Sequence, residues 1–558
     1  MQSLSVGEDP FGHPLLVELL AQFFDLLGER DFAGCHRLLE QAATQWTGTP
    51  AHQFLTYCRA IVFFDERRWD QAEHALRPLL SQVLHPRLHV RVLNELAMVQ
   101  EHFGRYEPAL EAYEQAIDQL GVLVEHDDAD RLYWAKVLKN HAICVRSAFE
   151  RGLVATDRLE SARDDLFFAL EIFQAGDEEV LEGRAWNQLG ASYRAEGHWD
   201  DAIVCYERDR AICERSGDLY GLAASLNNIG EALLGLGRYA EAAPLLETAA
   251  IQFGVADDPY EQADTLTNLG RALAGLQQPE AATARFTQAI DRVESLRERM
   301  VADVGRMDIF ATQMHVYGAG VSHALDQGQA VRSFDIAEKA RSRGLLELMK
   351  QTQATPTDLP PDLSAQEGEL RRQLAQQQGA RAEIEAKLAE VHRHMRLVPS
   401  AHAAITGADP LRTEEIVARL PPDTALISFF ATGDQIVAFC LSTRTGVQVA
   451  RLPISTNQLT GASFDAEGRV RSLLPGRSRR LPDPWLLARL YDALLRPLSQ
   501  HFTGHTRLVL VPHGPLFLTP LHAAYDRDQG AICSKISMSS TRPALRWRLM
   551  RSKPDGRR

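Results

Sequence analysis

A pattern of apolar, small and aromatic residues recurs about every forty residues in the first half of the chain. In the three clearest copies the small and aromatic positions are Trp186, Gly190, Tyr193 and Ala202, then Gly230 and Ala242, then Gly270 and Ala282. A weaker copy lies upstream, between Leu93 and Ala116. One unit of this length cannot bury its apolar stripe alone, so neighbouring units must stack. The period therefore predicts a solenoid of helical pairs.

The residues of each unit suit two packed helices. Small residues such as Gly190 allow the helices to approach closely, and Tyr193 fills the space beside them. The turn between the helices reads Gly-x-aromatic, as in Gly104-Arg-Tyr106, and glycine tolerates the positive φ that ends a helix. In the third copy Gln277 and Pro279 replace the glycine and the aromatic residue.

These residues resemble the tetratricopeptide repeat, and the spacing near forty resembles the subclass found in kinesin light chains and bacterial regulators. The resemblance implies a superhelical solenoid over residues 1–295, with six or seven units that start near residue 15. Weaker units are expected around Asp31, around Trp69 and around Ala142. In the last of these, about eight extra residues near 149–157 are expected to lengthen the turn.

Polar residues beside the small positions are the candidate ligand contacts. They are Asn94, Asn140, Asn187, Asn227 and Asn268, with Asn228, Glu231 and Arg271 close by. The resemblance implies that the first helix of each unit lines the concave face, where an amide can bond the backbone of an extended peptide. The alternative is that some of these asparagines join adjacent repeats. Glu231 and Arg271 are expected to add charge selectivity or to serve only as solvated charges.

Between the array and the C-terminal part, three segments are expected: capping helices at 296–351, a proline-containing linker at 352–362 and a heptad arm at 363–400. The heptad stripe either packs on its own chain as a hairpin or forms a dimer seam. Homo-oligomerisation is therefore one possibility.

Beyond residue 410 the periodicity changes to that of strands. Strands are expected at 424–430, 435–441, 447–452 and 507–512, with helices at 413–420 and 483–502. Residues 410–540 resemble the first half of a CHAT domain, a caspase-like module, and residues 541–558 form a basic tail. The family's catalytic histidine and cysteine fall later than this half, so we expect an incomplete α/β module without a catalytic dyad. His513 is expected to belong to the frame of the sheet, and Cys533 is not expected to form a dyad with His513 or His522.

Charge and cysteine content exclude several classes of function. The formal charge of −14 argues against nucleic acid and anionic membranes as partners, and the scattered cysteines form neither a disulfide framework nor a metal site. No cofactor is expected. The protein is expected to lie in the cytoplasm of a bacterium. The sequence thus predicts a mainly α protein that binds a protein or peptide and carries a non-catalytic CHAT-like module. The alternative is a fragment of a CHAT-family cysteine peptidase whose dyad lies beyond this chain.

Overall fold

The computed structural model describes residues 14–46, 50–66, 68–82, 84–123, 128–299, 306–351, 412–432, 435–454 and 484–514, with short pieces between 362 and 391 and between 516 and 537. Most of the expected linker and heptad arm and all of the expected tail at 541–558 lie outside these residues. Internal contacts divide the chain into unit 1, Met1–Leu276, and unit 2, Gln277–Arg558.

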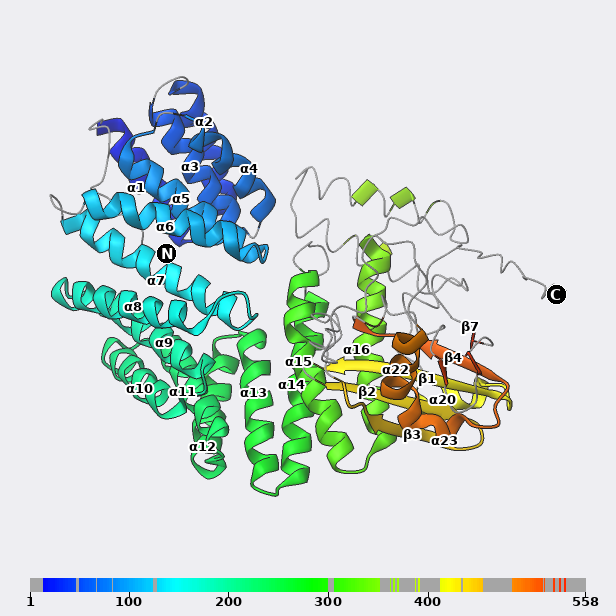
Figure 1. Ribbon diagram of the computed structural model, residues 1–558. Helices are drawn as coiled ribbons and strands as arrows, with labels where there is room; N and C mark the ends of the chain where they lie inside the picture. Colours follow the sequence, from blue (N-terminus) through cyan, green and yellow to red (C-terminus); the bar gives the residue numbers. More distant parts are fainter. Residues whose placement is uncertain are drawn as a thin grey trace, which may run out of the picture. The chain divides into compact units, whose positions relative to one another are not determined.

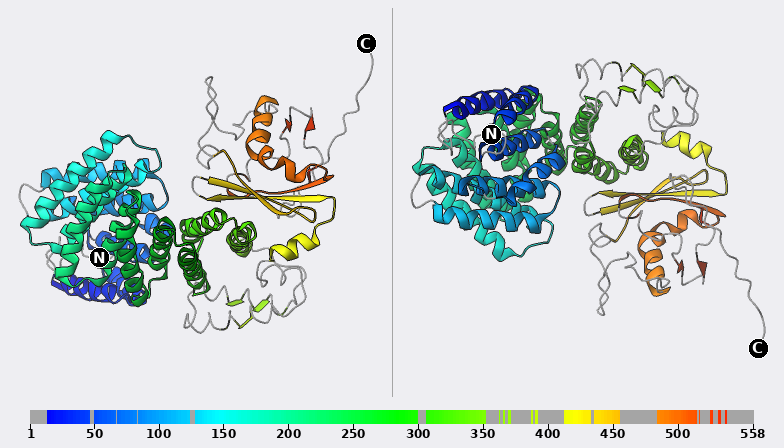
Figure 2. Two further views of the ribbon diagram at one scale, coloured as in Figure 1. Left: turned by 90° about the horizontal axis from the view of Figure 1, so that it is seen from below. Right: turned by 90° about the horizontal axis from the view of Figure 1, so that it is seen from above.

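Unit 1 is built entirely of helices in its described part, and these follow a curved path in Figures 1 and 2. They are α1 (Pro14–Gly28), α2 (Phe32–Gln45), α3 (Pro50–Asp65), α4 (Trp69–Leu80), α5 (Pro86–His102), α6 (Tyr106–Leu123), α7 (Asp128–Phe149), α8 (Thr156–Ala175), α9 (Glu179–Ala195), α10 (Trp199–Ser216), α11 (Leu219–Gly235), α12 (Tyr239–Val255) and α13 (Pro259–Gly275). Each helix packs on the next, from α1 to α13. The predicted solenoid of helical pairs is confirmed.

The turns between helices behave as the sequence predicts. Gly104, Gly197 and Gly237 have φ angles of 68°, 80° and 71°, the left-handed region that glycine enters without strain. Gln277, which replaces the glycine in the third copy, also has a positive φ of 58°. The turn geometry is therefore kept where the preferred residue is missing, at a conformational cost.

The small residues lie where two helices come closest. A Cβ atom placed on Gly190 would lie 2.6 Å from the ring of Tyr206, and one on Gly230 would lie 2.6 Å from Leu246. Ala202 and Ala242 are fully buried at the matching points of the second helices. A larger side chain at these positions would push the helices apart.

The insertion expected near 149–157 is divided between the turn and the helices. Residues 150–155 form the turn between α7 and α8, with Gly152 at a φ of 69°. The remaining extra length extends α7 to 22 residues, against 17 in α5 and α9. Ala148, a strong helix former, prolongs the helix because its side chain continues the buried stripe.

Unit 2 combines helices with a five-stranded sheet. Its helices are α14 (Pro279–Arg299), α15 (Arg306–Asp326), α16 (Ala330–Gln351), α20 (Thr413–Arg419), α22 (Pro484–Leu494), the 3₁₀ turn η1 (Arg496–Leu498) and α23 (Ser499–Phe502). Its strands are β1 (Thr424–Thr432), β2 (Gln435–Ser442), β3 (Gly446–Arg451), β4 (Arg507–Val511), β5 (Tyr525–Asp526), β6 (Ala531–Ile532) and β7 (Ile536–Ser537). The sheet order is β3-β2-β1-β4-β7, and β5 pairs separately with β6. β1 runs parallel to β4 and antiparallel to β2.

Helices cover both faces of this sheet, as Figure 2 shows with α22 in orange on one side and α15 and α16 in green on the other. Ile427 and Phe429 of β1 share a buried cluster with Leu494 of α22. On the opposite face the ring of Phe334 in α16 contacts that of Phe439 in β2, 5.2 Å away. The expected strands and the α/β character are confirmed.

The helix expected at 483–502 is broken. Pro497 lacks the N–H that would continue the helix, so α22 ends at Leu494 and a 3₁₀ turn precedes the short α23. In the described pieces of the heptad arm, Glu369 and Leu370 line one hollow together with Glu390 and Val391. The two ends of the heptad stripe therefore lie close to each other within one chain.

Candidate functional site

The candidate site is the layer made by the first helices of the pairs in unit 1. Among these helices α3 contacts α5, α5 contacts α7, α7 contacts α9, and α11 contacts α13. Polar side chains at equivalent turns of these helices consequently lie in adjacent rows. We call this surface the first-helix layer.

Four of the predicted asparagines form two pairs across neighbouring first helices. Nδ2 of Asn140 in α7 donates to Oδ1 of Asn94 in α5 at 3.1 Å. Nδ2 of Asn268 in α13 donates to Oδ1 of Asn227 in α11 at 3.2 Å. We call these two bonds the amide pairs. They connect adjacent repeats, which is the alternative role that the sequence analysis gave for some of the asparagines.

The asparagines differ in how much of each side chain is open to a ligand. Asn94, Asn227 and Asn268 are buried, with 4%, 9% and 7% of their surfaces exposed, whereas Asn140 and Asn187 are half-buried. Nδ2 of Asn187 donates to Oδ2 of Asp209 in α10 at 2.8 Å. The second N–H and the oxygen of Asn187 are then available to a ligand. Asn140 and Asn187 are therefore the two best placed to reach a ligand.

The two predicted charged residues also have partners inside the array. Glu231 accepts a hydrogen bond from Nη1 of Arg194 in α9 at 2.8 Å. Nη1 of Arg271 donates to Oδ1 of Asn268 at 3.1 Å, and the rest of Arg271 is exposed. The Glu231 pair links two repeats, and Arg271 extends the second amide pair toward solvent.

Two basic residues missing from the predicted set complete the layer. Nζ of Lys139 donates to Oδ1 of Asn140 at 2.8 Å, and Arg184 in α9 is exposed. Burial, together with the nearby Arg184 cation, lowers the pKa of Lys139 to about 8. The sequence signal was a run of basic residues at helical spacing, Lys136 and Lys139, on the same face as the asparagine.

A buried carboxyl group lies beside the first amide pair. Glu95 has 9% of its surface exposed, and it accepts a 3.4 Å hydrogen bond from Nδ2 of Asn94. Burial, reinforced by the charge of Asp65, raises the pKa of Glu95 to about 7. One turn earlier, the buried Arg91 lies over the ring of Tyr133 at 4.5 Å.

His513 in unit 2 has a structural role. Its Nδ1 accepts a hydrogen bond from the backbone N–H of Ala431 at 3.1 Å, which ties the end of β4 to the end of β1. Its ring stacks on Phe430, and burial together with the Arg341 cation lowers its pKa to about 4. Cys533 and His522 lie outside the described residues.

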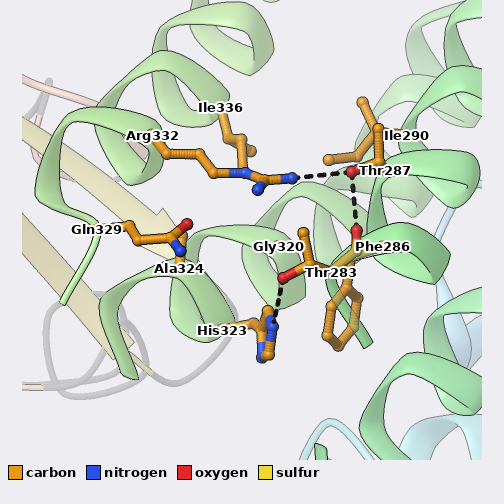
Figure 3. A pocket seen from close by; sticks show the side chains of 10 residues that line it. All are labelled: Thr283, Phe286, Thr287, Ile290, Gly320, His323, Ala324, Gln329, Arg332 and Ile336. Atoms are coloured by element: carbon orange, nitrogen blue, oxygen red, sulfur yellow. Dashed lines mark hydrogen bonds between the residues drawn. The ribbon is translucent and has the colours of Figure 1, made fainter. Parts of the chain in front are cut away.

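A small hollow lies between α14, α15 and α16 (Figure 3). Its volume of about 10 Å³ is close to the space that one water molecule needs. Its polar groups already bond one another: Thr283 Oγ1 lies 2.9 Å from Nε2 of His323, and Arg332 donates to Oγ1 of Thr287 at 3.0 Å. The hollow therefore offers little to a larger ligand.

The described residues contain no group of three or more His, Cys, Asp or Glu side chains suited to a metal ion. The six cysteines in the described part are buried and unpaired with one another, and burial raises the thiol pKa of Cys35 and of Cys440 to about 11. These thiols are inert at neutral pH.

Within the parts of the chain that the structure covers, no helix combines the length and apolar character that crossing a membrane requires.

Comparison with solved structures returned proteins of low similarity. The signal-transduction ATPase with numerous domains (STAND) from Pyrococcus horikoshii, which has a tetratricopeptide repeat sensor, is 14% identical over 62% of this chain, with a TM-score of 0.44. This chain spans about half of that protein, 49%. The apo form of RapI is 15% identical over 68% of this chain and 98% of its own length, with a TM-score of 0.44. BtubC from P. vanneervenii is 23% identical over 43% of this chain and 92% of its own, with a TM-score of 0.32.

No curated protein matches the chain. Family comparison is more specific. Residues 57–121, 181–250 and 221–295 match the tetratricopeptide repeat. The matched segments contain Trp186, Gly190 and Gly230, at the positions where the helices approach closely. Residues 57–121 and 181–295 therefore carry tetratricopeptide repeats.

Proposed function

We propose that the chain is a scaffold that binds a protein or an extended peptide on the first-helix layer of unit 1. The observation that carries this proposal is the set of incompletely used polar groups on adjacent tetratricopeptide helices. Asn140 and Asn187 are half-buried: Asn187 keeps one N–H and its oxygen, Asn140 keeps one acceptor position on its oxygen, and Arg184 is exposed on the same helix as Asn187. Such groups suit the alternating N–H and C=O groups of an extended backbone.

Around Lys139 and Arg184 the charges of the layer favour an acidic ligand. In the described part of the chain, the ammonium group of Lys139 bonds the neutral amide oxygen of Asn140, and Arg184 lies close enough to lower its pKa. A carboxylate from the ligand would stabilise both cations and would restore the proton affinity of Lys139. The buried asparagines, held in the amide pairs, fix the spacing of the helices that present these groups.

For unit 2 we propose a CHAT-like module that has a structural or regulatory role and performs no peptide hydrolysis. Three features support it: strands in the positions that the residue pattern beyond 410 predicted, helices on both faces of the sheet, and a His513 whose Nδ1 is already bonded to the frame. A histidine held in this way cannot use Nδ1 as a proton acceptor toward a thiol.

The test is selection from a random peptide display library with the purified full chain. We expect selected peptides to be rich in Asp and Glu, and their affinity to fall about tenfold or more in the double variant Arg184→Ala/Asn187→Ala, because a charged and a neutral hydrogen bond are lost. Incubation should leave the bound peptides intact.

The matched control is Glu160→Ala, which removes an exposed charge from the second helix α8. Peptides that bind the double variant as tightly as the parent chain would place the ligand elsewhere. Cleavage of the peptide by the parent chain would contradict the non-catalytic role of unit 2.

A further inference from the structure

The carboxyl ends of two parallel strands meet on the α16 side of the sheet in unit 2. Ser428 of β1 pairs with Val511 of β4. Two residues further along each strand, the rings of Phe430 and His513 stack at 4.9 Å with an 18° angle between their planes. Residues that alternate along a strand share a face, so Ser428, Phe430 and His513 point to the same side of the sheet.

A guanidinium group is buried on that side. Arg341 in α16 has 9% of its side chain exposed and forms an ion pair with Glu338 through Nη2. Its Nε and Nη1 have no hydrogen-bond partner in the described part of the chain. The group lies over the ring of Phe334, which packs against Phe439 of the neighbouring strand β2. Because Phe439 is the register partner of Ser428, Arg341 lies against the sheet close to the level of Ser428.

The bond to Ala431 fixes which nitrogen of His513 carries the proton. Because Nδ1 accepts the N–H of Ala431, the neutral ring holds its proton on Nε2, which becomes a donor. The hydroxyl of Ser428, fully buried on the same face, also has no hydrogen-bond partner among the described residues. His513 is only half-buried and the next residue, Gly514, is exposed, so this end of the cluster opens to solvent.

We propose that Arg341 and His513 form a binding site for a carboxylate group at the carboxyl ends of β1 and β4. The carboxylate oxygens accept hydrogen bonds from Nε or Nη1 of Arg341 and from Nε2 of His513. A single negative charge fits better than a phosphate dianion, because Glu338 already balances part of the guanidinium charge. Parallel sheets commonly bind ligands outside the carboxyl ends of their strands, which is where this cluster lies.

This site is separate from the first-helix layer, and it does not depend on the function proposed for unit 1. The carboxylate can come from a small free acid or from an acidic side chain of a peptide. Acetate and the peptide Ac-Ala-Asp-Ala-NH₂ distinguish the two sources, and Ac-Ala-Asn-Ala-NH₂ removes the charge while keeping the shape.

The experiment follows the thermal midpoint of the full chain during titration at constant ionic strength. Acetate, the Asp peptide or both should raise the midpoint more than sodium chloride and the Asn peptide do, since a ligand that binds only the folded state stabilises it. A response to acetate alone assigns a small acid, and a response to the Asp peptide assigns a peptide. Arg341→Met should abolish the rise, and His513→Asn should weaken binding about tenfold.

His513→Asn is the variant that separates binding from folding. The Asn oxygen can take the place of Nδ1 and keep the bond to Ala431, but the Nε2 donor is lost. An undiminished response in this variant would overturn the proposal even if Arg341→Met did not fold. Equal midpoints in acetate, chloride and both peptides for the parent chain would overturn it as well.

Discussion

In unit 1 some residues serve tight helix packing and others bury an ionisable group. Tyr206 fills the space that Gly190 leaves open, whereas Glu95 places an ionisable group among buried neighbours. The glycine positions and their turns could be predicted from the sequence, because positive φ and close approach select one residue type. The partners of the asparagines could not, since Asn227 and Asn268 are 41 residues apart and meet only when two repeats stack.

Glu95 makes the stability of unit 1 depend on pH. Its pKa is raised to about 7 in the folded chain, against about 4.3 in an unfolded one. The folded state therefore retains a proton that the unfolded state releases, and stability falls as pH rises from about 4.3 to 7. Glu95→Gln should raise the free energy of unfolding by about 3–4 kcal/mol at pH 8 and by almost nothing at pH 4.5. Urea denaturation at both pH values measures the difference, and an equal gain at both would show that ionisation is not its source.

Neighbouring helices are held together by polar bonds as well as by apolar contacts. The amide pairs and the ion pair between Arg194 and Glu231 connect first helices that belong to different repeats. The apolar period predicted the helix positions. It did not predict the helix end at Leu494, because the apolar pattern continues past Pro497, three residues further on, although the proline interrupts the helix. The extra residues near 149–157 illustrate another limit, since periodicity does not say whether an insertion lengthens a turn or a helix.

The second amide pair can be tested by a double-mutant cycle. Asn227→Ala and Asn268→Ala should each lower the free energy of unfolding by about 1–3 kcal/mol, because each leaves a buried polar group without its partner. The double variant should lose about 1 kcal/mol less than the sum of the two. Urea denaturation gives the three values. Asn187→Ala combined with Asn268→Ala is the control, since these residues have separate partners and their effects should add.

At the scale of the whole molecule, the chain forms two compact units, and their boundary differs from the one that the repeat pattern suggests. Unit 2 includes helices α14 to α16 as well as the strands, and Phe334 of α16 packs against Phe439 on one face of the sheet. From the sequence these helices look like a continuation of the array, since an apolar stripe shows that a face is buried without showing what covers it. The candidate ligand contacts stay predictions, and the roles of Lys139 and Arg184 beside them depend on neighbours that only the folded chain brings together.

Separate cores predict separate unfolding. Phe334→Ala removes a fully buried ring from unit 2 and should destabilise it by about 3–5 kcal/mol. In scanning calorimetry we expect two transitions, of which this variant lowers one. Leu246→Ala, at a fully buried position of unit 1, should lower the other. A single transition shifted by both variants would mean that the two units unfold as one.

The amide pairs also restrict how such an array can change by gain or loss of whole repeats. Asn94 is matched to Asn140, and Asn227 to Asn268, whereas Asn187 on the helix between these pairs bonds within its own hairpin. Removing one hairpin of a matched set would separate a buried amide from its present partner, whereas a tandem duplicate carries an asparagine at the same position and keeps an amide opposite each amide. Gain of a hairpin by tandem duplication is therefore better tolerated in this array than loss of a hairpin from a matched set.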